Sequence, residues 1–302
     1  PEIKTLHLTW FAFFLSFMVW FAHAPLMMVI RDAMHLSDQE VKILLILNIS
    51  LTIPARIVVG MLVDKYGPKQ LFASILILGG LISIGFAFTQ TYQQLAIVRF
   101  LSGFVGAGFV VGIRMISEWF PARQTGIAQG IYGGWGNFGS AGAAIILPSV
   151  ALYFGAENGW RYAIGMTGAI AIIYGVIYYF SVSNTPKGST YFSPKKMGAL
   201  EVTSKGDLLL YIIMNIPMYI ALAVLTWKLS AKMNWIDELV AYGVYATLAV
   251  LYIFQVWKII QVNKPIFETE VPEIQRYAFK QIAILDLAYM LTFGAELAVV
   301  SM

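Results

Sequence analysis

The sequence predicts an all-α integral membrane protein, and three observations support this fold class. Of the 302 residues, 59% are hydrophobic and only 12% are charged. Soluble domains average about 45–50% apolar and about 25% charged residues. The mean hydropathy is +0.74. Finally, about nine segments approach or reach the roughly 20 apolar residues that a helix needs to cross a bilayer.

The expected spans follow one another with short loops, apart from two longer polar stretches before the seventh and the ninth. Pro25 lies in the outer half of the first span and is expected to kink it. Each span must be helical, because lipid offers no hydrogen-bond partners to the backbone. The expected spans are residues 8–30, 41–63, 71–88, 95–116, 126–147, 162–182, 208–227, 239–257 and 282–302.

Charge and cysteine content exclude several classes of function. The formal net charge of +4 is explained by membrane orientation, so no nucleic-acid partner is expected. The chain has no cysteine, which excludes disulfides, thiolate metal sites and cysteine nucleophiles. His7, His23 and His35 are scattered without metal-ligand spacing. We expect no metal, no cofactor and no enzymatic activity, since no nucleophile, base and orienting group come together.

The loop charges predict the orientation of the helices. Lysine and arginine gather at the start of the chain and after the second, fourth and sixth spans, whereas the intervening loops hold Asp38, Glu40 and Glu157. By the positive-inside rule the amino terminus is cytoplasmic, and we expect a multi-pass protein of the plasma (inner) membrane. The chain begins at Pro1 and stops at Met302 inside a hydrophobic run, so we expect a truncated chain. We expect no cleavable signal peptide, because the first apolar segment is long enough to span and lacks a small-residue cleavage site.

The fifth span is unusually rich in glycine. On a helix, steps of three and four place Gly126, Gly130, Gly133 and Asn137 on one face, which Ala141 and Ala144 continue. Such a face allows close helix packing, whereas its single amide could serve a solute in a water-filled cavity; both interpretations remain open. Residues 134–139 match the dinucleotide-binding fingerprint, but that motif requires a soluble strand–turn–helix context, and we reject it.

Ionisable residues within the spans are candidates for function, because they are costly in lipid. Asn48, Thr52 and Arg56 form one polar stripe on the second span. Arg56 is interpreted as an anion site or as one partner of a structural ion pair with a distant acid. His23 is a hydrogen-bonded interior histidine or a proton-linked group, and Glu296 is neutral, ion-paired or a proton site.

The fourth span contains Arg99 near one end and a glycine-rich run up to Phe109, whose ring either packs in the core or forms the wall of a cavity. Arg114 and Glu118 are four residues apart near the other boundary. Residues at this spacing are neighbours on a helix surface. We therefore expect a structural ion pair there.

Three motifs together resemble a known family. Gly60-x-x-x-Asp64-Lys65-x-Gly67-x-Lys69 resembles the signature loop of the major facilitator superfamily, with lysines at two usual arginine positions. Arg99 resembles that superfamily's second motif. More narrowly, the run Gly130-Ile131-Tyr132-Gly133-Gly134-Trp135-Gly136-Asn137-Phe138-Gly139 is similar to the nitrate signature of the nitrate/nitrite porter family, and the chain resembles the amino-terminal portion of cyanobacterial-type nitrate permeases.

The resemblance implies roles for particular residues. Arg56 would bind the anion, Phe109 would form an aromatic wall, and Asn137 would donate a hydrogen bond. Glu296 would take part in proton coupling. The expected signature and helix-packing residues are Gly130, Gly133, Gly134, Gly136 and Gly139, and the expected gating residues are Gly60, Asp64, Lys65, Gly67, Lys69 and Arg99.

The resemblance also implies a domain organisation. Residues 1–182 would be the amino-terminal six-helix half, 183–206 a cytoplasmic linker, and 207–258 two additional transmembrane helices. Residues 259–280 would be a cytoplasmic loop, and 281–302 the start of an incomplete carboxy-terminal half. The expected partners are nitrate or nitrite, protons, membrane lipid and the rest of the carboxy-terminal half.

The implied function is secondary active transport of nitrate, and of nitrite, by proton-coupled uptake with alternating access. Rival interpretations are nitrate/nitrite exchange, transport of another small anion, and a sensor that binds nitrate without moving it. The lack of a soluble signalling domain in this sequence counts against the sensor.

Overall fold

The computed structural model describes residues 1–155, 157–191, 199–268 and 278–300, with side chains up to Thr292. The described residues form helices and connecting loops, without a strand. The chain divides into two compact units, mainly Pro1–Ser193 and Pro194–Val299. The boundary between the units falls within the linker predicted from the sequence.

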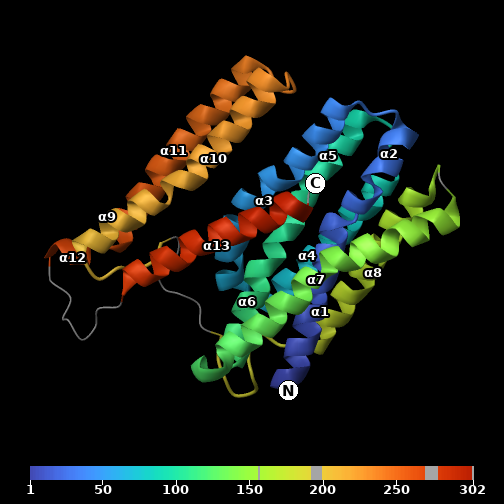
Figure 1. The fold of residues 1–302 in the computed structure, drawn as a ribbon. Helices are drawn as coiled ribbons and strands as arrows, with labels where there is room; N and C mark the ends of the chain where they lie inside the picture. The colour runs from blue at the N-terminus through green and yellow to red at the C-terminus, as the bar shows by residue number, and fades with distance from the viewer. Residues whose placement is uncertain (156, 192–198, 269–277, 301–302) are drawn as a thin grey trace. The chain divides into compact units, whose positions relative to one another are not determined.

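The first unit is a bundle of helices that provides six candidate spans (Figure 1). The first span is broken after Phe21, near the expected kink at Pro25, and continues as a second helix. The fourth span is broken by a 3₁₀ turn that the sequence analysis did not predict. The helices are α1 (Glu2–Phe21), η1 (Ala24–Leu26), α2 (Met27–Met34), α3 (Asp38–Tyr66), α4 (Pro68–Ala87), α5 (Tyr92–Ser102), η2 (Gly103–Ala107), α6 (Gly108–Trp119), α7 (Ala122–Phe154) and α8 (Gly159–Ser181).

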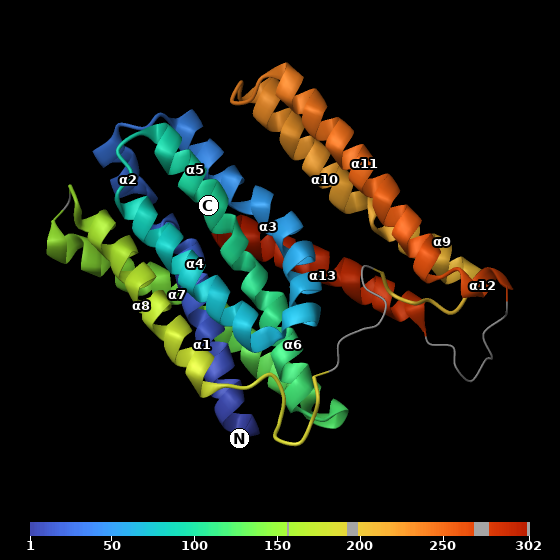
Figure 2. The same ribbon diagram turned by 180° about the vertical axis from the view of Figure 1, so that it is seen from behind.

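Two close helix pairs organise the bundle, α4 with α8 and α1 with α7 (Figure 2). A Cβ atom at Gly80 or at Gly168 would meet the carbonyl oxygen of the other. A Cβ atom at Gly136 or Gly139 would likewise collide with Phe13 or with the Phe14 carbonyl. Small residues let helix backbones approach closely, as is common in membranes.

The helix ends carry specific caps. Ser37 and Glu40 form a capping box at the start of α3, which satisfies backbone N–H groups that have no partner within the helix. Gly67 joins α3 to α4 with a φ of +86°, a conformation that glycine adopts without steric cost. The Asn184 side chain lies against Gly67, and its Oδ1 accepts a 2.9 Å hydrogen bond from the Lys69 backbone N–H.

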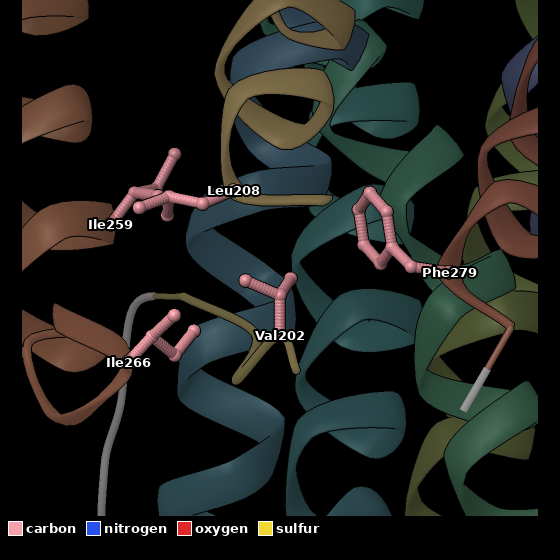
Figure 3. Packing of buried hydrophobic residues seen from close by; sticks show 5 residues of the cluster. All are labelled: Val202, Leu208, Ile259, Ile266 and Phe279. Atoms are coloured by element: carbon pink, nitrogen blue, oxygen red, sulfur yellow. The ribbon is translucent and has the colours of Figure 1, made fainter. Parts of the chain in front are cut away.

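The second unit contains a long helical hairpin and a small apolar cluster. The hairpin helices provide the seventh and eighth candidate spans. The cluster consists of Val202, Leu208, Ile259, Ile266 and Phe279 (Figure 3). The helices are α9 (Lys205–Met214), α10 (Ile216–Trp227), the π-helical turn η3 (Lys228–Lys232), α11 (Glu238–Val262), α12 (Pro265–Glu268) and α13 (Phe279–Val300).

Two amides tie the second unit together. Asn263 is 2% exposed; its Oδ1 accepts from the Val202 N–H at 2.7 Å, and its Nδ2 donates to the Leu200 carbonyl at 2.9 Å. Gln255 accepts from the Tyr219 hydroxyl at 2.6 Å and donates to Asn215 at 2.9 Å. Many apolar side chains of the hairpin are exposed, among them Leu239, Ile253 and Phe254, as expected for helices that cross a bilayer.

The ninth expected span, residues 282–302, coincides largely with α13. Eight helical stretches in the described parts of the chain are long and apolar enough to cross a membrane. The ninth expected span stays a prediction, because part of it lies outside the residues whose side chains are described. Glu296, the expected proton-coupling residue, lies outside the residues whose side chains are described.

Candidate functional site

The half-buried Arg56 side chain of α3 lies against the break in the fourth span. Its Nε donates to the Gly106 carbonyl oxygen at 3.3 Å, and its guanidinium carbon is 5.6 Å from the centre of the Phe109 ring. A cation within about 6 Å of an aromatic ring centre is attracted by the ring's quadrupole. The structure therefore brings together two of the three predicted anion-site residues, from α3 and α6.

The polar stripe of α3 explains how Arg56 is positioned. Asn48 and Thr52, which precede it on the same face, are both buried. The Thr52 hydroxyl donates to the Gly103 carbonyl oxygen at 2.8 Å. A Cβ atom at Gly103 would collide with the Asn48 carbonyl, and one at Gly106 with Trp20 and Thr52. The glycines of η2 thus let α3 approach closely, and the η2 carbonyls accept hydrogen bonds from the stripe.

An aromatic layer supports Phe109 from behind. The ring of Phe13 is 5.6 Å from that of Phe109 and 4.8 Å from that of Tyr132. Phe13 and Tyr132 are fully buried, and the Tyr132 hydroxyl donates to the Phe109 carbonyl at 3.2 Å. Sequence analysis did not single out Phe13 or Tyr132. Tyr132 could have been found from the sequence, because it is an aromatic residue within the glycine-rich run.

Asn137 is half-buried on α7, and its Oδ1 is a buried oxygen without a hydrogen-bond partner. Among the described residues, no hydrogen bond joins its side chain directly to Arg56 or Phe109. Its chain neighbour Gly136 packs on Phe13, which contacts Phe109 in turn. The Asn137 amide therefore lies on a helix that borders the aromatic layer, and its Oδ1 can still accept a hydrogen bond.

The signature glycines divide into two groups. Gly136 and Gly139 pack against α1, where an added Cβ would collide. An added Cβ at Gly126, Gly130, Gly133 or Gly134 meets nothing within 4 Å. Within the described residues, the first part of the smooth face expected along the helix makes no such close contact, because the helix packs through a neighbouring face.

The expected gating residues lie at the ends of α3 and α4, except Arg99. Asp64 is 3.7 Å from Arg114, which also pairs with Glu118 at 2.9 Å, so the expected Arg114–Glu118 pair is present. Lys65 lies over the Tyr66 ring and Lys69 over the Tyr179 ring, at 5.1 and 4.5 Å. A Cβ added at Gly60 meets nothing within 4 Å.

A segment after α8 also reaches this group. The Tyr191 hydroxyl donates to the Val63 carbonyl at 2.6 Å and accepts from Arg114 Nε at 3.3 Å. Burial raises the pKa of the Tyr191 hydroxyl, and the hydrogen bond from Arg114 opposes that shift. The start of the predicted linker is thereby latched to the ends of α3 and α6, which the sequence could not indicate because residue 191 stands in an aperiodic polar stretch.

Arg99 has a different environment from the other expected gating residues. It is only 2% exposed, and its Nη1 donates to the Trp20 carbonyl at 3.3 Å and to the Ser102 hydroxyl at 3.1 Å. The Ser102 hydroxyl is also 3.2 Å from Asn48 Oδ1. Arg99 therefore belongs to a buried polar network within the bundle rather than to the loop between α3 and α4.

Comparisons with known proteins agree with this architecture. The chain is 44% identical to the nitrate/nitrite transporter NrtP of Nostoc punctiforme over 306 aligned residues, which cover 99% of this chain and 61% of the relative. The NrtP protein of Picosynechococcus gives the same identity and the same two coverages. A probable nitrate/nitrite antiporter of Thermus thermophilus is 30% identical, over 62% of this chain and 44% of its own length.

The chain thus spans about three fifths of the length of the two NrtP proteins. These relatives are named as transporters, in keeping with the expectation that the protein is not an enzyme. A bacterial homologue of the lysosomal transporter Spinster, in an inward-facing and unoccupied conformation, shares the fold with a TM-score of 0.52 at 14% identity, over 83% of this chain and 59% of its own.

The model of the Major Facilitator Superfamily matches residues 9–300, nearly the whole chain. Together with eight helices that are long and apolar enough to span a bilayer, this match confirms the all-α membrane fold and the superfamily expected from the motifs. The protein is a multi-pass integral membrane protein that belongs to the major facilitator superfamily.

Proposed function

We propose that this chain forms the Arg56 side of the substrate site in a transporter of nitrate, and of nitrite, in the plasma (inner) membrane. The names of the relatives that align with almost the whole chain support this substrate class. The observation that carries the proposal is the placement of the Arg56 guanidinium at 5.6 Å from the Phe109 ring centre.

The chemistry of this pair suits a planar oxyanion. A guanidinium offers a flat fork of N–H donors that matches planar oxygens, and its charge is fixed at all physiological pH values. The ring beside it offers a flat apolar wall. Nitrate is planar and delocalised, whereas phosphate and sulfate are tetrahedral, so the pair favours nitrate and nitrite. The Asn137 amide would add a hydrogen bond when the transporter changes conformation.

Transport would follow alternating access, in which two helical halves rock around a site near the middle of the membrane. Residues 1–182 form one half in this proposal, and residues 281–302 begin the other. The two helices between residues 207 and 258 are additional spans. The open glycine positions on α7, Gly130, Gly133 and Gly134, would form a sliding surface, since a surface without side chains need not repack.

Uptake of an anion against a negative interior needs a driving force of about 2.3 kcal/mol per charge per 100 mV. Two or more protons per nitrate would supply it, and the proposal assigns Glu296 a part in this coupling. Proton symport predicts that Glu296→Gln uncouples nitrate uptake from the pH gradient. Unchanged proton co-transport in that variant would remove Glu296 from the mechanism.

The decisive experiment measures nitrate uptake by nitrate-depleted cells that express the full-length transporter, while external pH is recorded. We expect uptake with alkalinisation for the wild type and none for Arg56→Lys. Arg123→Lys is the matched control, because Arg123 is exposed at the start of α7. Normal uptake by Arg56→Lys would make Arg56 structural. Nitrate entry that requires internal nitrite, without a pH change, would establish exchange in place of symport.

A further inference from the structure

A small cavity inside the first unit is lined by two nitrogen-bearing side chains from different segments of the chain. Arg99 comes from α5, and His23 follows α1; they are 2% and 3% exposed. The cavity measures about 20 Å³, and one water-sized molecule needs about 10–15 Å³. Its other lining residues are Val19, Ala22, Gly79, Ile82, Ser83, Phe86, Ser102 and Ile164.

The charge at this cavity is not balanced by an acidic side chain. Within the described ranges, the recorded ion pairs join Arg31 to Asp38, and Arg114 to Asp64 and Glu118. None includes Arg99, whose recorded partners are a carbonyl and a hydroxyl. A guanidinium removed from water carries a large desolvation penalty, which only an opposite charge with good geometry offsets well.

Hydrogen-bonding capacity is also left over at the cavity, on Arg99 and His23, and in the network joined to it, on Asn48. Arg99 Nε, His23 Nε2 and Asn48 Nδ2 are buried nitrogens without a hydrogen-bond partner. The Nε–H of Arg99 and the amide N–H of Asn48 can only donate. The Ser102 hydroxyl links Asn48 to Arg99. The network thus has an excess of donors over acceptors in addition to its positive charge.

We propose that this cavity binds a monatomic anion of the halide class, such as chloride, as the counter-ion of Arg99. The ion accepts the Nε–H of Arg99, and also a hydrogen bond from His23 when Nε2 carries the proton. A single-atom anion suits the size of the cavity, whereas nitrate has four heavy atoms. The site therefore differs from the Arg56 region in both residues and ligand, and it does not depend on the proposed transport of nitrate.

The test measures thermal unfolding of the purified full-length protein by tryptophan fluorescence in detergent. Sodium gluconate is replaced stepwise by sodium chloride or sodium bromide at constant ionic strength, without nitrate. A ligand that binds only the folded state raises the unfolding midpoint in a saturable manner. We expect both halides to raise it by several degrees. A midpoint independent of halide would overturn the proposal, and water would then be the occupant.

Variants locate the effect. Arg99→Met keeps the length of the side chain but removes the charge, and we expect it to abolish the halide response. Arg56→Met and Arg161→Met should retain the response, because neither residue lines the cavity. A response lost in Arg56→Met but kept in Arg99→Met would place the ion at the other arginine and refute the proposal.

If Arg99→Met does not fold, a variant at His23 tests the same site. His23→Phe keeps the ring and removes the nitrogens, and we expect bromide binding at least about tenfold weaker, from the loss of a charge-assisted hydrogen bond. Anomalous diffraction from crystals soaked in bromide provides a direct measurement. A peak between His23 and Arg99 supports the site, whereas peaks found only elsewhere contradict it.

Discussion

The guanidinium of Arg56 lies 5.6 Å from the centre of the Phe109 ring while its Nε donates to the Gly106 carbonyl three residues before that ring. One residue of α3 is therefore fixed at two points to the break in the neighbouring span. Because the ring and the carbonyl hold the side chain in one orientation, the guanidinium plane would meet a planar anion at a fixed angle in the proposed site.

Phe109→Leu should weaken nitrate transport without unfolding the bundle. Leucine keeps most of the apolar contact but removes the ring's attraction for the cation, which is worth about 0.5–2 kcal/mol. We expect the KM for nitrate to rise by roughly two- to thirtyfold, since each 1.4 kcal/mol is tenfold. Phe138→Leu, at an exposed position of α7, is the control. An unchanged KM for Phe109→Leu would remove the ring from the site.

Gly136→Leu and Gly133→Leu should fail in different ways. Gly136 packs against Phe13 of α1, whereas a side chain at Gly133 meets nothing within 4 Å. Overpacking typically costs about 1–3 kcal/mol, so Gly136→Leu should lower the thermal unfolding midpoint and the yield of folded protein. Gly133→Leu should keep the wild-type midpoint yet abolish nitrate uptake. Normal uptake by folded Gly133→Leu would refute the sliding-surface proposal.

Asn263→Leu should loosen the second unit. The variant leaves the Val202 N–H and the Leu200 carbonyl without their partner, and an unsatisfied buried group costs about 1–3 kcal/mol. We expect faster amide hydrogen exchange at residues 200–214 than in the wild type. Gln261→Leu, at an exposed position two residues earlier on α11, is the control. Equal exchange rates in both variants would show that the Asn263 bonds are dispensable.

The Tyr191 latch should weaken at alkaline pH. Burial raises the pKa of this hydroxyl above its ordinary value, so the folded state holds the proton more tightly than the unfolded state. The stabilisation is complete below the unfolded pKa of about 10 and is lost as pH rises through the higher folded pKa. The thermal unfolding midpoint should therefore fall less in Tyr191→Phe than in the wild type when the pH is raised from about 9 to about 11, which is about one unit either side of the unfolded pKa. Tyr66→Phe, at an exposed residue, should behave as the wild type.

Hydropathy indicated the eight described stretches that are long and apolar enough to cross a membrane, because the length and apolar character of a segment are local properties. The polar stripe of α3 could also be predicted from the sequence, since steps of four place Asn48, Thr52 and Arg56 on one face. The break at η2 was missed, because the run from Gly103 to Phe109 is apolar enough to continue a helix. Its conformation depends on α3, which approaches through Gly103 and Gly106.

The placement of the glycine-rich face on α7 required the structure. Spacing defines which residues share a face, but the neighbour that a face meets is decided by the whole bundle. Here Phe13 and Phe14 of α1 pack against Gly136 and Gly139. These two glycines lie on a face of α7 next to the face predicted from the spacing. The same limit applies to Arg99, whose carbonyl partner on Trp20 is 79 residues distant in sequence.

That separation has a consequence for biosynthesis. An arginine within a transmembrane helix opposes its entry into the bilayer, by up to about 2.5–3.5 kcal/mol at the helix centre on translocon insertion scales. The Trp20 carbonyl that accepts from Arg99 is synthesised long before α5 emerges from the ribosome, and Ser102 follows Arg99 within one turn. The partners of this charge are therefore available as α5 enters the membrane, and a chain lacking α1 should leave α5 delayed at the translocon.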